Sequence, residues 1–355
     1  MSKITRVIIL GYGHLGQFLV EQLKSLVQFD VVKIYNRSPQ EEVISYDSFT
    51  PQELENVDLV VEVAHPEVIR KYGAMVLRKT NLFIGSPTCL ADETLFESLK
   101  AVSAHHNTSI FVPAGAFWGG NDIQKMAELG TLLALTVTMT KHPSSFKLES
   151  PLKEKNEEAK NQDKPTVLYE GPVRGLCPLA PNNVNTMAGA AVAAKNLGFN
   201  GVKARLVSDP KMTDWHVVEV LAEGPDGFHV ETKRMNPAKP GAVTGQLTYY
   251  SFLASIKESL SYTKKQYWIG YSTLFTGGQY FVWTNHSQSN YTNWVAANGS
   301  TYDSTYIDMS CSGCWRPESG LIFPKNYICS KDEPRVPLTT PSPIRNCSCP
   351  PNWES

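Results

Sequence analysis

The sequence predicts an α/β protein, in which a Rossmann-like, doubly wound parallel sheet at the N-terminus precedes an α+β domain with a mixed sheet. Three observations support this. A β-branched run enters a glycine motif and an amphipathic stretch; short apolar strands then alternate with helical segments; and longer, alternating strands replace them after about residue 130. With 355 residues, the chain is long enough for two or three domains.

The glycine motif begins the first predicted domain. Residues 7–16 read Val-Ile-Ile-Leu-Gly-Tyr-Gly-His-Leu-Gly, and a helical pattern follows. Gly11 permits a sharp turn, Gly13 leaves bare backbone for a pyrophosphate, and Gly16 lets the helix pack closely on the strand. Free N–H groups and the helix dipole then hold the phosphates. The motif predicts a dinucleotide site, for NAD or NADP, formed by Gly11, Tyr12, Gly13, His14, Leu15 and Gly16.

Alternating elements extend this domain over residues 1–115. Strands are expected at 31–35, 58–64, 81–85 and 109–113, with helices between them. His65 precedes a proline at a helix start, so we expect it to cap that helix or to line the pocket. A helix at 246–260, within residues 241–260, is expected to return to this domain.

The end of the second strand bears on the choice of cofactor. NAD-binding folds commonly place an acid there, where it binds the ribose 2′-hydroxyl. This chain has Asn36 followed by Arg37. An asparagine binds a hydroxyl without repelling a phosphate, and Arg37 either pairs with a 2′-phosphate or is a solvated surface residue. We therefore expect either NAD or NADP as the cofactor.

The second domain is predicted over residues 116–240. Residues 132–141 form a Thr-rich alternating strand, and the polar segment 143–165 is expected to be a mobile excursion. A helix rich in Ala and Gly follows at 182–197. Three strands are then expected at 202–208, 215–222 and 228–234. We expect this sheet to mediate a homodimer.

Three segments carry a resemblance to a known family: Pro113-Ala-Gly-Ala-Phe-Trp-Gly-Gly-Asn-Asp122, residues 168–174 with 181–185, and Asp209-Pro-Lys-Met-Thr-Asp-Trp-His216. In these the chain resembles the L-aspartate dehydrogenase family, including its animal members. Shorter matches occur at Glu62-Val-Ala64, Gly85-Ser-Pro-Thr88, Thr140-Lys-His-Pro143 and Asn236-Pro237. The resemblance covers residues 3–256, and its motifs occur in the order that the family has.

The resemblance implies oxidation of L-aspartate with NAD(P)+, through iminoaspartate to oxaloacetate and ammonia, within amino-acid metabolism and NAD biosynthesis. The family's catalytic histidine corresponds to His216, and its cofactor contacts correspond to Ala116 and Asn185, with Ala64 as a further contact. The family often has Asn-x-His at the catalytic segment, where this chain has Asp214-Trp-His216.

The chemistry of these side chains agrees with the resemblance. An imidazole can take a proton from the amine and later activate water at the imine. Lys141 is our candidate for binding a substrate carboxylate. A structural role for His216, and helix N-capping by Asn185, are the alternatives. Ser86 either contacts the cofactor or starts a turn, and His105 and His106 are expected to face solvent.

Charge and hydropathy bear on the partners. The net charge is −1, which implies neither a nucleic-acid nor a membrane partner. The sequence contains no run of about 20 apolar residues, so no membrane span is expected. The first residues lack the apolar region of a signal peptide, so a cytoplasmic location is expected.

The C-terminal part has a different composition. Residues 261–332 resemble the second half of a C-type lectin-like domain, and 333–355 form a Pro/Ser/Thr/Cys-rich tail. Five of the seven cysteines lie at or beyond Cys311, and four glycosylation sequons start at Asn285, Asn290, Asn298 and Asn346. The acidic and amide ligands of a calcium site are missing, and no Cys/His pairs have zinc spacing, so no metal site is expected. We therefore interpret residues 261–355 as a fused or passenger segment that takes no part in the dehydrogenase function.

Two alternative functions stay open at this point. A dehydrogenase of the same architecture would act on another small amino or hydroxy acid. A lectin-like binding protein would instead use the C-terminal segment and carry a degenerate enzyme domain.

Overall fold

The computed structural model describes residues 4–243 and 245–263, with 266–272, 282–283, 304–308, 314–318 and 326–327. The chain divides into two compact units, Met1–Ile256 and Lys257–Ser355. Among the described residues, no helix has the length and apolar character needed to cross a membrane.

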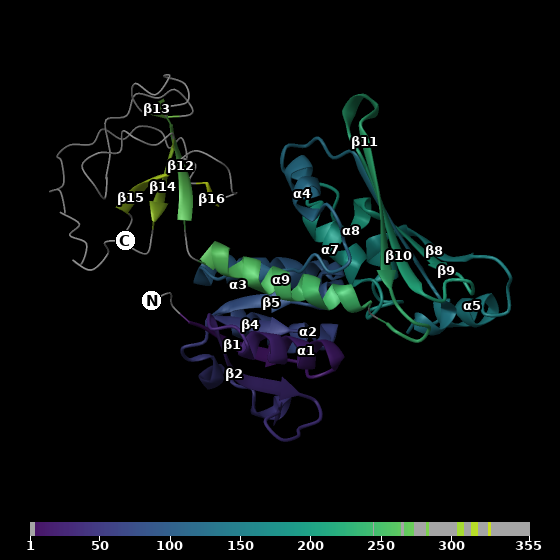
Figure 1. Cartoon of the computed structure of the whole chain (residues 1–355), viewed down its shortest axis with the longest axis horizontal. Coiled ribbons are helices and arrows are strands. Elements are labelled where there is room, and N and C mark those ends of the chain that lie inside the picture. Colours follow the sequence, from purple (N-terminus) through teal and green to yellow (C-terminus); the bar gives the residue numbers. More distant parts are fainter. Residues whose placement is uncertain are drawn as a thin grey trace. The chain divides into compact units, whose positions relative to one another are not determined.

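The first unit begins with the predicted parallel sheet (Figure 1). Its strands lie in the order β3-β2-β1-β4-β5-β6, and every neighbouring pair is parallel. Long apolar side chains of β1, β4 and β5 are fully buried, as expected for strands covered on both faces. The bounds are β1 Thr5–Leu10, β2 Phe29–Asn36, β3 Ile44–Ser45, β4 Leu59–Glu62, β5 Asn81–Ile84 and β6 Ile110–Phe111.

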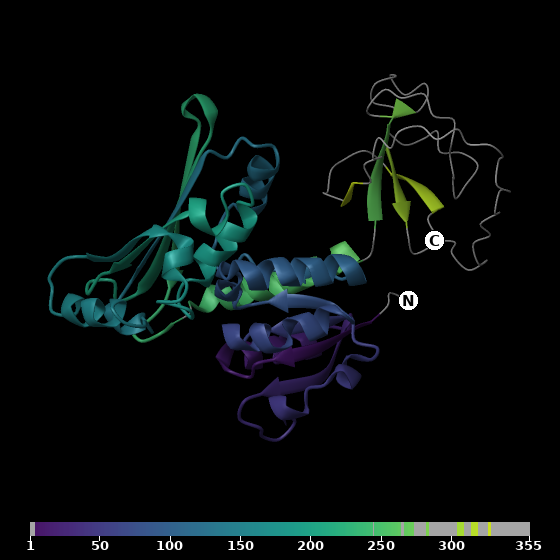
Figure 2. The ribbon, with the colours of Figure 1, turned by 180° about the vertical axis from the view of Figure 1, so that it is seen from behind.

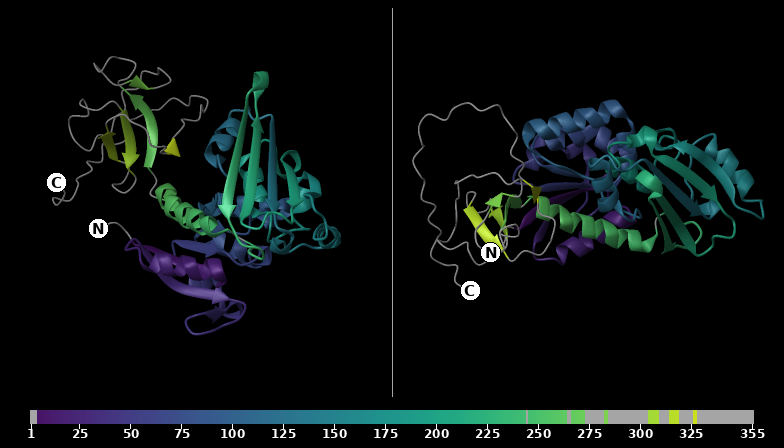
Figure 3. Two further views of the ribbon diagram at one scale, coloured as in Figure 1. Left: turned by 45° about the vertical axis from the view of Figure 1, so that its right-hand side comes forward. Right: turned by 90° about the horizontal axis from the view of Figure 1, so that it is seen from above.

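Helices cover both faces of this sheet (Figure 3). α1 (His14–Lys24) and α9 (Gln246–Thr263) lie together on one face, where Phe18 packs against Tyr249 and Tyr250 with ring centroids 5.5 and 5.1 Å apart. α2 (Pro66–Leu77) and α3 (Glu93–His106) lie on the other face. The short 3₁₀ segments are η1 (Tyr46–Ser48), η2 (Pro51–Leu54) and η3 (Pro87–Ala91). The prediction of a doubly wound fold is confirmed.

The second sheet of this unit is mixed, also as predicted. Its order is β11-β10-β7-β9-β8; β7 and β9 run parallel, and the other pairs are antiparallel. α4 (Gly120–Glu128), α7 (Asn185–Ala193) and α8 (Gly198–Gly201) pack on one face of it (Figures 1 and 2). The bounds are β7 Ala134–Lys141, β8 Thr166–Pro172, β9 Lys203–Ser208, β10 Trp215–Glu223 and β11 His229–Pro237, with α6 at Val173–Leu176 and η5 at Pro225–Gly227.

Residues 143–165 contradict the expectation of a mobile excursion. They form η4 (Pro143–Ser145) and α5 (Leu152–Ala159) and are tied to the sheet by a buried side chain. Asn156 donates from Nδ2 to the carbonyl of Pro143 at 3.0 Å and accepts from the Ser208 hydroxyl at 2.8 Å. Leu152 is also buried, so a few inward residues anchor a segment whose composition is otherwise polar. The predicted helix at 182–197 is shorter, because only Asn185–Ala193 is α-helical.

The second unit contains five described strands: β12 (Gln266–Ser272), β13 (Val282–Trp283), β14 (Ser304–Asp308), β15 (Cys314–Glu318) and β16 (Asn326–Tyr327). Their order is β13-β12-β14-β15, and β16 pairs with β12 in parallel. The four sequons and the tail at 333–355 lie outside the described residues. The lectin-like resemblance therefore stays a prediction.

Candidate active site

A cavity of about 650 Å³ lies in the first unit, where the carboxyl ends of its parallel strands meet the second sheet. Predicted cofactor-binding residues and predicted catalytic or substrate-binding residues both contribute to its wall. Among the residues that line it are Gly13, His14, Leu15, Ala64, Ser86, Ala116, Lys141, Asn185, His216 and Asn236.

The glycine turn forms one end of this cavity. Gly11 has φ +117°, and a Cβ there would lie 2.8 Å from the backbone of Val63. A Cβ on Gly16 would lie 2.1 Å from the carbonyl oxygen of Gly11, so only glycine permits this helix–strand contact. Around Gly13, by contrast, a Cβ would meet no protein atom within 4 Å. The bare backbone at the start of α1 therefore faces open space, into which a pyrophosphate fits.

The predicted residues at the end of β2 lie apart from the cavity wall. Asn36 donates from Nδ2 to the carbonyl of Ser38 at 3.4 Å, and Arg37 is exposed. Gly11, Tyr12 and Gly16 also do not line the cavity, although they shape the turn that does. No acid occupies the position after β2. The position that commonly carries a ribose-binding acid therefore presents no carboxylate to a 2′-phosphate.

A row of four polar residues, the polar row, crosses the second sheet at the other end of the cavity. His216 of β10 lies opposite Asn236 of β11, and Lys141 of β7 lies opposite Ser208 of β9. The Val217–Thr140 pair places His216 and Lys141 side by side across the β10–β7 ladder. Residues that are far apart in the sequence, at 141, 208, 216 and 236, thus meet on one face of the sheet.

His216 is a buried, neutral imidazole. It is 4% exposed, and its Nε2 has no hydrogen-bond partner among the described residues. A hydrogen bond between the ring and the backbone of Ala242 opposes the lowering of its pKa. Burial, and then the charge of Lys141, lowers the pKa of His216 to about 3. The ring is therefore uncharged at neutral pH, and Nε2 is left to act as a proton acceptor.

Lys141 is a buried cation. It is 4% exposed, its Nζ donates to the carbonyl of Val243 at 3.0 Å, and no carboxylate lies within ion-pair distance in the described part of the chain. Burial lowers the pKa of Lys141 to about 8. A buried ammonium without a counter-ion is costly unless a ligand supplies one. This arrangement suits an anionic ligand.

Two amides with buried side-chain oxygens complete the wall. The oxygen of Asn185 has no partner among the described residues, and Val184, not Asn185, occupies the N-cap of α7. N-capping by Asn185, considered above as an alternative, is therefore excluded. Asn236 donates from Nδ2 to the carbonyl of His216 at 3.2 Å, which directs its unpartnered oxygen the other way. Ala116 is 8% exposed and lies on the loop before α4.

Asn236 and Glu62 were not singled out from the sequence as site residues. Each occurs only within a short match to the family, Asn236 in Asn236-Pro237 and Glu62 in Glu62-Val-Ala64. Glu62 is a lone acid at the carboxyl end of an apolar strand, which is a usual ligand-binding position and the signal that could have identified it.

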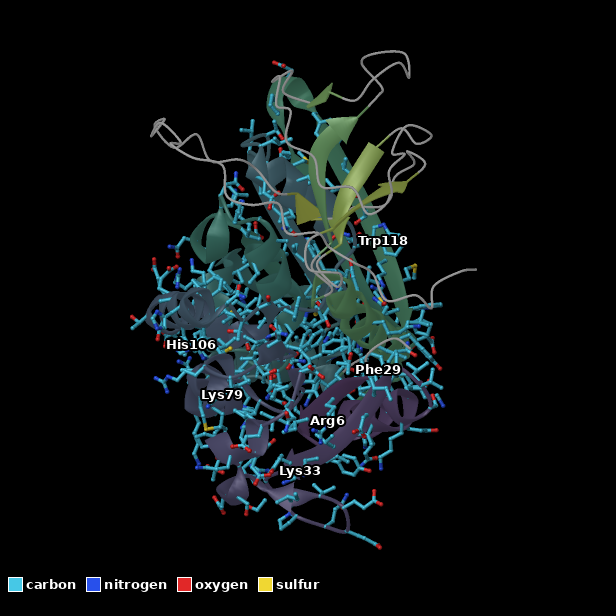
Figure 4. All side chains as sticks on the ribbon, turned by 90° about the vertical axis from the view of Figure 1, so that its left-hand side faces the viewer. Arg6, Phe29, Lys33, Lys79, His106 and Trp118 are labelled. Atoms are coloured by element: carbon cyan, nitrogen blue, oxygen red, sulfur yellow. The ribbon has the colours of Figure 1, made fainter. Side chains whose placement is uncertain are left out.

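Of the other residues considered in the sequence, Ser86 lines the cavity, whereas His65, Asp214 and His106 do not. Ser86 is buried, lines the cavity and bonds to Glu62. His65 caps α2, since its Nδ1 accepts from the amide of Glu67 at 3.3 Å. Asp214 is exposed and accepts from the Thr213 hydroxyl, so it does not contribute to the cavity wall. His106, at the end of α3, is exposed as expected (Figure 4).

Comparison with known proteins gives a consistent result. The family model described as aspartate dehydrogenase, C-terminal, matches residues 122–259. The model described as homoserine dehydrogenase, NAD binding domain, matches residues 11–113. The glycine turn and the polar row thus each fall within a dehydrogenase model.

Individual relatives match over most of their own length. An aspartate dehydrogenase domain-containing protein of Danio rerio is 46% identical over 267 residues, which cover 72% of this chain and 95% of that protein. The L-aspartate dehydrogenase of Thermotoga maritima is 29% identical over 256 residues, which cover 71% of this chain and 95% of that enzyme. A crystal structure of aspartate dehydrogenase from Thermotoga maritima has a TM-score of 0.56 at 24% identity and covers 74% of this chain and 97% of its own. The structural likeness shows a common fold. The 46% identity to the Danio rerio protein, over 95% of its length, shows that the chain belongs to the aspartate dehydrogenase family.

Proposed function

We propose that this protein oxidises L-aspartate with NAD+ or NADP+ to iminoaspartate, which water converts to oxaloacetate and ammonia. The observation that carries the proposal is the pair formed by His216 and Lys141. A neutral imidazole with a free Nε2 lies beside a buried ammonium that has no carboxylate partner in the described part of the chain. A proton acceptor and an anion-binding group are therefore adjacent in a cavity that also contains a dinucleotide turn.

The cofactor would be held by the glycine turn, with the free N–H groups at the start of α1 binding its phosphates. Ala64, Ala116 and Asn185 line the same cavity and would surround its nicotinamide half. The unpartnered oxygen of Asn185 accepts hydrogen bonds only, which suits a carboxamide N–H. When bound there, NAD(P)+ takes up the hydride that leaves the substrate's α-carbon.

The side chains of the polar row would handle the substrate. The Lys141 ammonium binds a carboxylate of aspartate, and this negative charge offsets the effect of Lys141 on the neighbouring imidazole. The pKa of His216 then rises from its value in the free enzyme, so Nε2 can take a proton from the substrate's ammonium group. The neutral amine lone pair forms the C=N bond as the hydride leaves.

Hydrolysis follows with the same residue. His216 first releases to solvent the proton that it took from the substrate, and it then takes a proton from water as the water oxygen bonds to the imine carbon. It passes this proton to the nitrogen, and the C–N bond breaks as the new hydroxyl becomes the carbonyl, so that its proton leaves with the ammonia as ammonium. The unpartnered oxygen of Asn236, directed by its bond to the His216 carbonyl, is an acceptor for an N–H of the substrate. Hydrogen-bond acceptors thus predominate around the position that an amino group would occupy.

The test is formation of reduced nicotinamide by the full chain with L-aspartate, with NAD+ and NADP+ offered separately. L-malate, L-homoserine and L-glutamate serve as competing substrates. Aspartate-dependent reduction, with oxaloacetate and ammonia as products, is the expected result. Reduction with another of these acids alone would replace aspartate as the substrate but retain the dehydrogenase.

We also propose a homodimer formed through the second sheet. The face opposite α4 and α7 carries Thr136, Thr138 and Thr140 on β7 and, towards the edge, Trp215 and Met235, which are 38% and 48% exposed. A second copy of this chain would cover these residues. Light scattering is expected to give a dimer for the wild type and a monomer for Thr138→Arg, while Glu158→Arg, at an exposed position of α5, stays dimeric. A monomeric wild type would refute this proposal.

A further inference from the structure

The carboxylate of Glu62 is completely buried beside two loops of the cavity wall. Glu62 is the last residue of β4 and is 0% exposed. Its Oε1 accepts from the amide of Ala64 at 2.7 Å and from the hydroxyl of Ser86 at 3.0 Å. Its Oε2 accepts from the amide of Ser86 at 3.0 Å. One side chain therefore joins the loops that follow β4 and β5.

These loops border the proposed cofactor site. Val63, Ala64, Gly85 and Ser86 all line the cavity. The Gly85 amide also donates to the carbonyl of Glu62 at 2.8 Å, and a Cβ on Gly85 would lie 2.4 Å from that oxygen. The loop after β4 in turn touches the glycine turn, since a Cβ on Gly11 would lie 2.9 Å from the Cβ of Ala64. A shift at Glu62 would therefore reach both loops and the turn.

No cationic side chain within ion-pair distance neutralises Glu62 in the described part of the chain, so donors alone stabilise its charge. Burial raises the pKa of Glu62 to about 7, while the three hydrogen bonds from Ala64 and Ser86 oppose that rise. The titratable groups that interact with it are Tyr46 on η1 and Cys89 on η3. Burial chiefly, and then the charge of Glu62, raises the pKa of each, so both stay neutral near pH 7.

We infer that Glu62 is a positioning residue whose ionised carboxylate fixes the loops at Ala64 and Ser86 around the cofactor. An ionised carboxylate only accepts hydrogen bonds and therefore satisfies all three donors. The amide of a glutamine would present its NH2 group to the backbone amide of Ala64 or of Ser86, and neither amide can accept a hydrogen bond. A protonated carboxyl loses the charge that strengthens these bonds, and its O–H can donate only to the Ser86 hydroxyl, which must then stop donating. Either change weakens the link between the two loops, and the cofactor loses part of its binding surface.

The test is the dissociation constant of NADH, measured by fluorescence without substrate at intervals between about pH 6 and about pH 8.5. NADH has no ionisable group in this range. Wild-type affinity is expected to fall as the pH is lowered through about 7, because Glu62 becomes protonated. Glu62→Gln is expected to bind NADH about tenfold more weakly at the alkaline end and to lose the acidic decline. Any change near pH 8 that both proteins share belongs to Lys141.

Two further variants keep the outcome decisive. Glu67→Gln, on the exposed side of α2, is the matched control and should show the wild-type profile. Ser86→Ala removes one of the three donors and should weaken NADH binding about threefold with the pH response retained. A flat wild-type profile, or a Glu62→Gln profile that follows the wild type, would overturn the inference. Because the NADH-binding assay contains no aspartate, these outcomes do not depend on the proposed substrate.

Discussion

The glycine turn and three members of the polar row, Lys141, His216 and Asn236, line the same cavity but are built from different parts of the molecule. The turn uses backbone within residues 11–16, where the absence of side chains creates the binding surface. The polar row uses side chains of Lys141, Ser208, His216 and Asn236, which four strands bring together. One end depends on local chain geometry, and the other depends on the register of a whole sheet.

This difference teaches that the two ends should respond differently to substitution. A change in the polar row removes a charge or a proton acceptor but leaves the turn intact, so chemistry and substrate binding suffer while cofactor binding survives. A change in the turn has the opposite effect. Glu62 lies outside both, because it acts through the loops at Ala64 and Ser86.

The largest effect is expected for His216→Ala. Loss of the uncharged proton acceptor beside Lys141 should lower kcat about a thousandfold, since general acid–base groups contribute on this scale. NADH affinity should be unchanged, as measured by fluorescence. His229→Ala, an exposed histidine on β11, is the matched control and should have wild-type kcat. If NADH binding and kcat fell to the same extent, the polar row and the glycine turn would not have independent roles.

Lys141→Met should raise the KM for L-aspartate about a hundredfold, because a buried cation that pairs with the substrate is replaced by an uncharged side chain of similar length. The NADH dissociation constant should again be unaffected. Lys141→Arg keeps the charge and should recover part of the loss. Unchanged KM in the methionine variant would remove Lys141 from the substrate site.

The pH dependence of wild-type KM provides a second test of Lys141. Burial lowers its pKa to about 8 in the free protein, so the ammonium is present below that pH and is lost above it. The KM for the anionic substrate should therefore rise as the pH increases through about 8. Lys141→Arg should not show this rise, because a guanidinium stays charged over this range. A rise of the same size in both proteins would point to another titrating group.

The same contrast explains how much the sequence could predict. The turn, the alternating strands and helices, and the mixed second sheet are local patterns, and the structure confirms them. His216 and Lys141 were also predicted as site residues, from a family resemblance and from chemistry respectively, and both line the cavity. Their adjacency follows from the β10–β7 register, which spacing along the chain does not reveal.

Features that depend on a distant partner were missed or wrong. The mobile excursion expected at 143–165 is helical, because Asn156 bonds to Pro143 and Ser208 from a segment of polar composition. Asn185 was predicted as a cofactor contact with helix N-capping as the alternative, but the N-cap of α7 is Val184. Asn236 and Glu62 gain significance only from their partners, the His216 carbonyl and the donors of Ala64 and Ser86.

Gly13→Ala tests the turn itself. The added Cβ would meet no protein atom within 4 Å, so the stability of the free protein should not fall. The methyl group would instead enter the space proposed for the pyrophosphate, and NADH should bind at least about tenfold more weakly. Gly16→Ala is the contrasting variant: its Cβ would lie 2.1 Å from the carbonyl oxygen of Gly11, so Tm itself should drop. Tight NADH binding by Gly13→Ala would place the phosphates elsewhere.

The smallest effect is expected at the edge of the cofactor end, for Arg37→Ala. Arg37 is exposed, so an ion pair with a 2′-phosphate would be weakened by solvent and contribute at most about 1 kcal/mol. The ratio of kcat/KM for NADP+ to that for NAD+ should fall about threefold to fivefold, and the KM for aspartate should stay constant. Asn36→Asp should lower the same ratio further, because it adds a negative charge where the wild type has only an amide. If neither substitution changes the ratio, the 2′-position lies away from the end of β2, and the open turn at Gly13 alone determines how the dinucleotide is held.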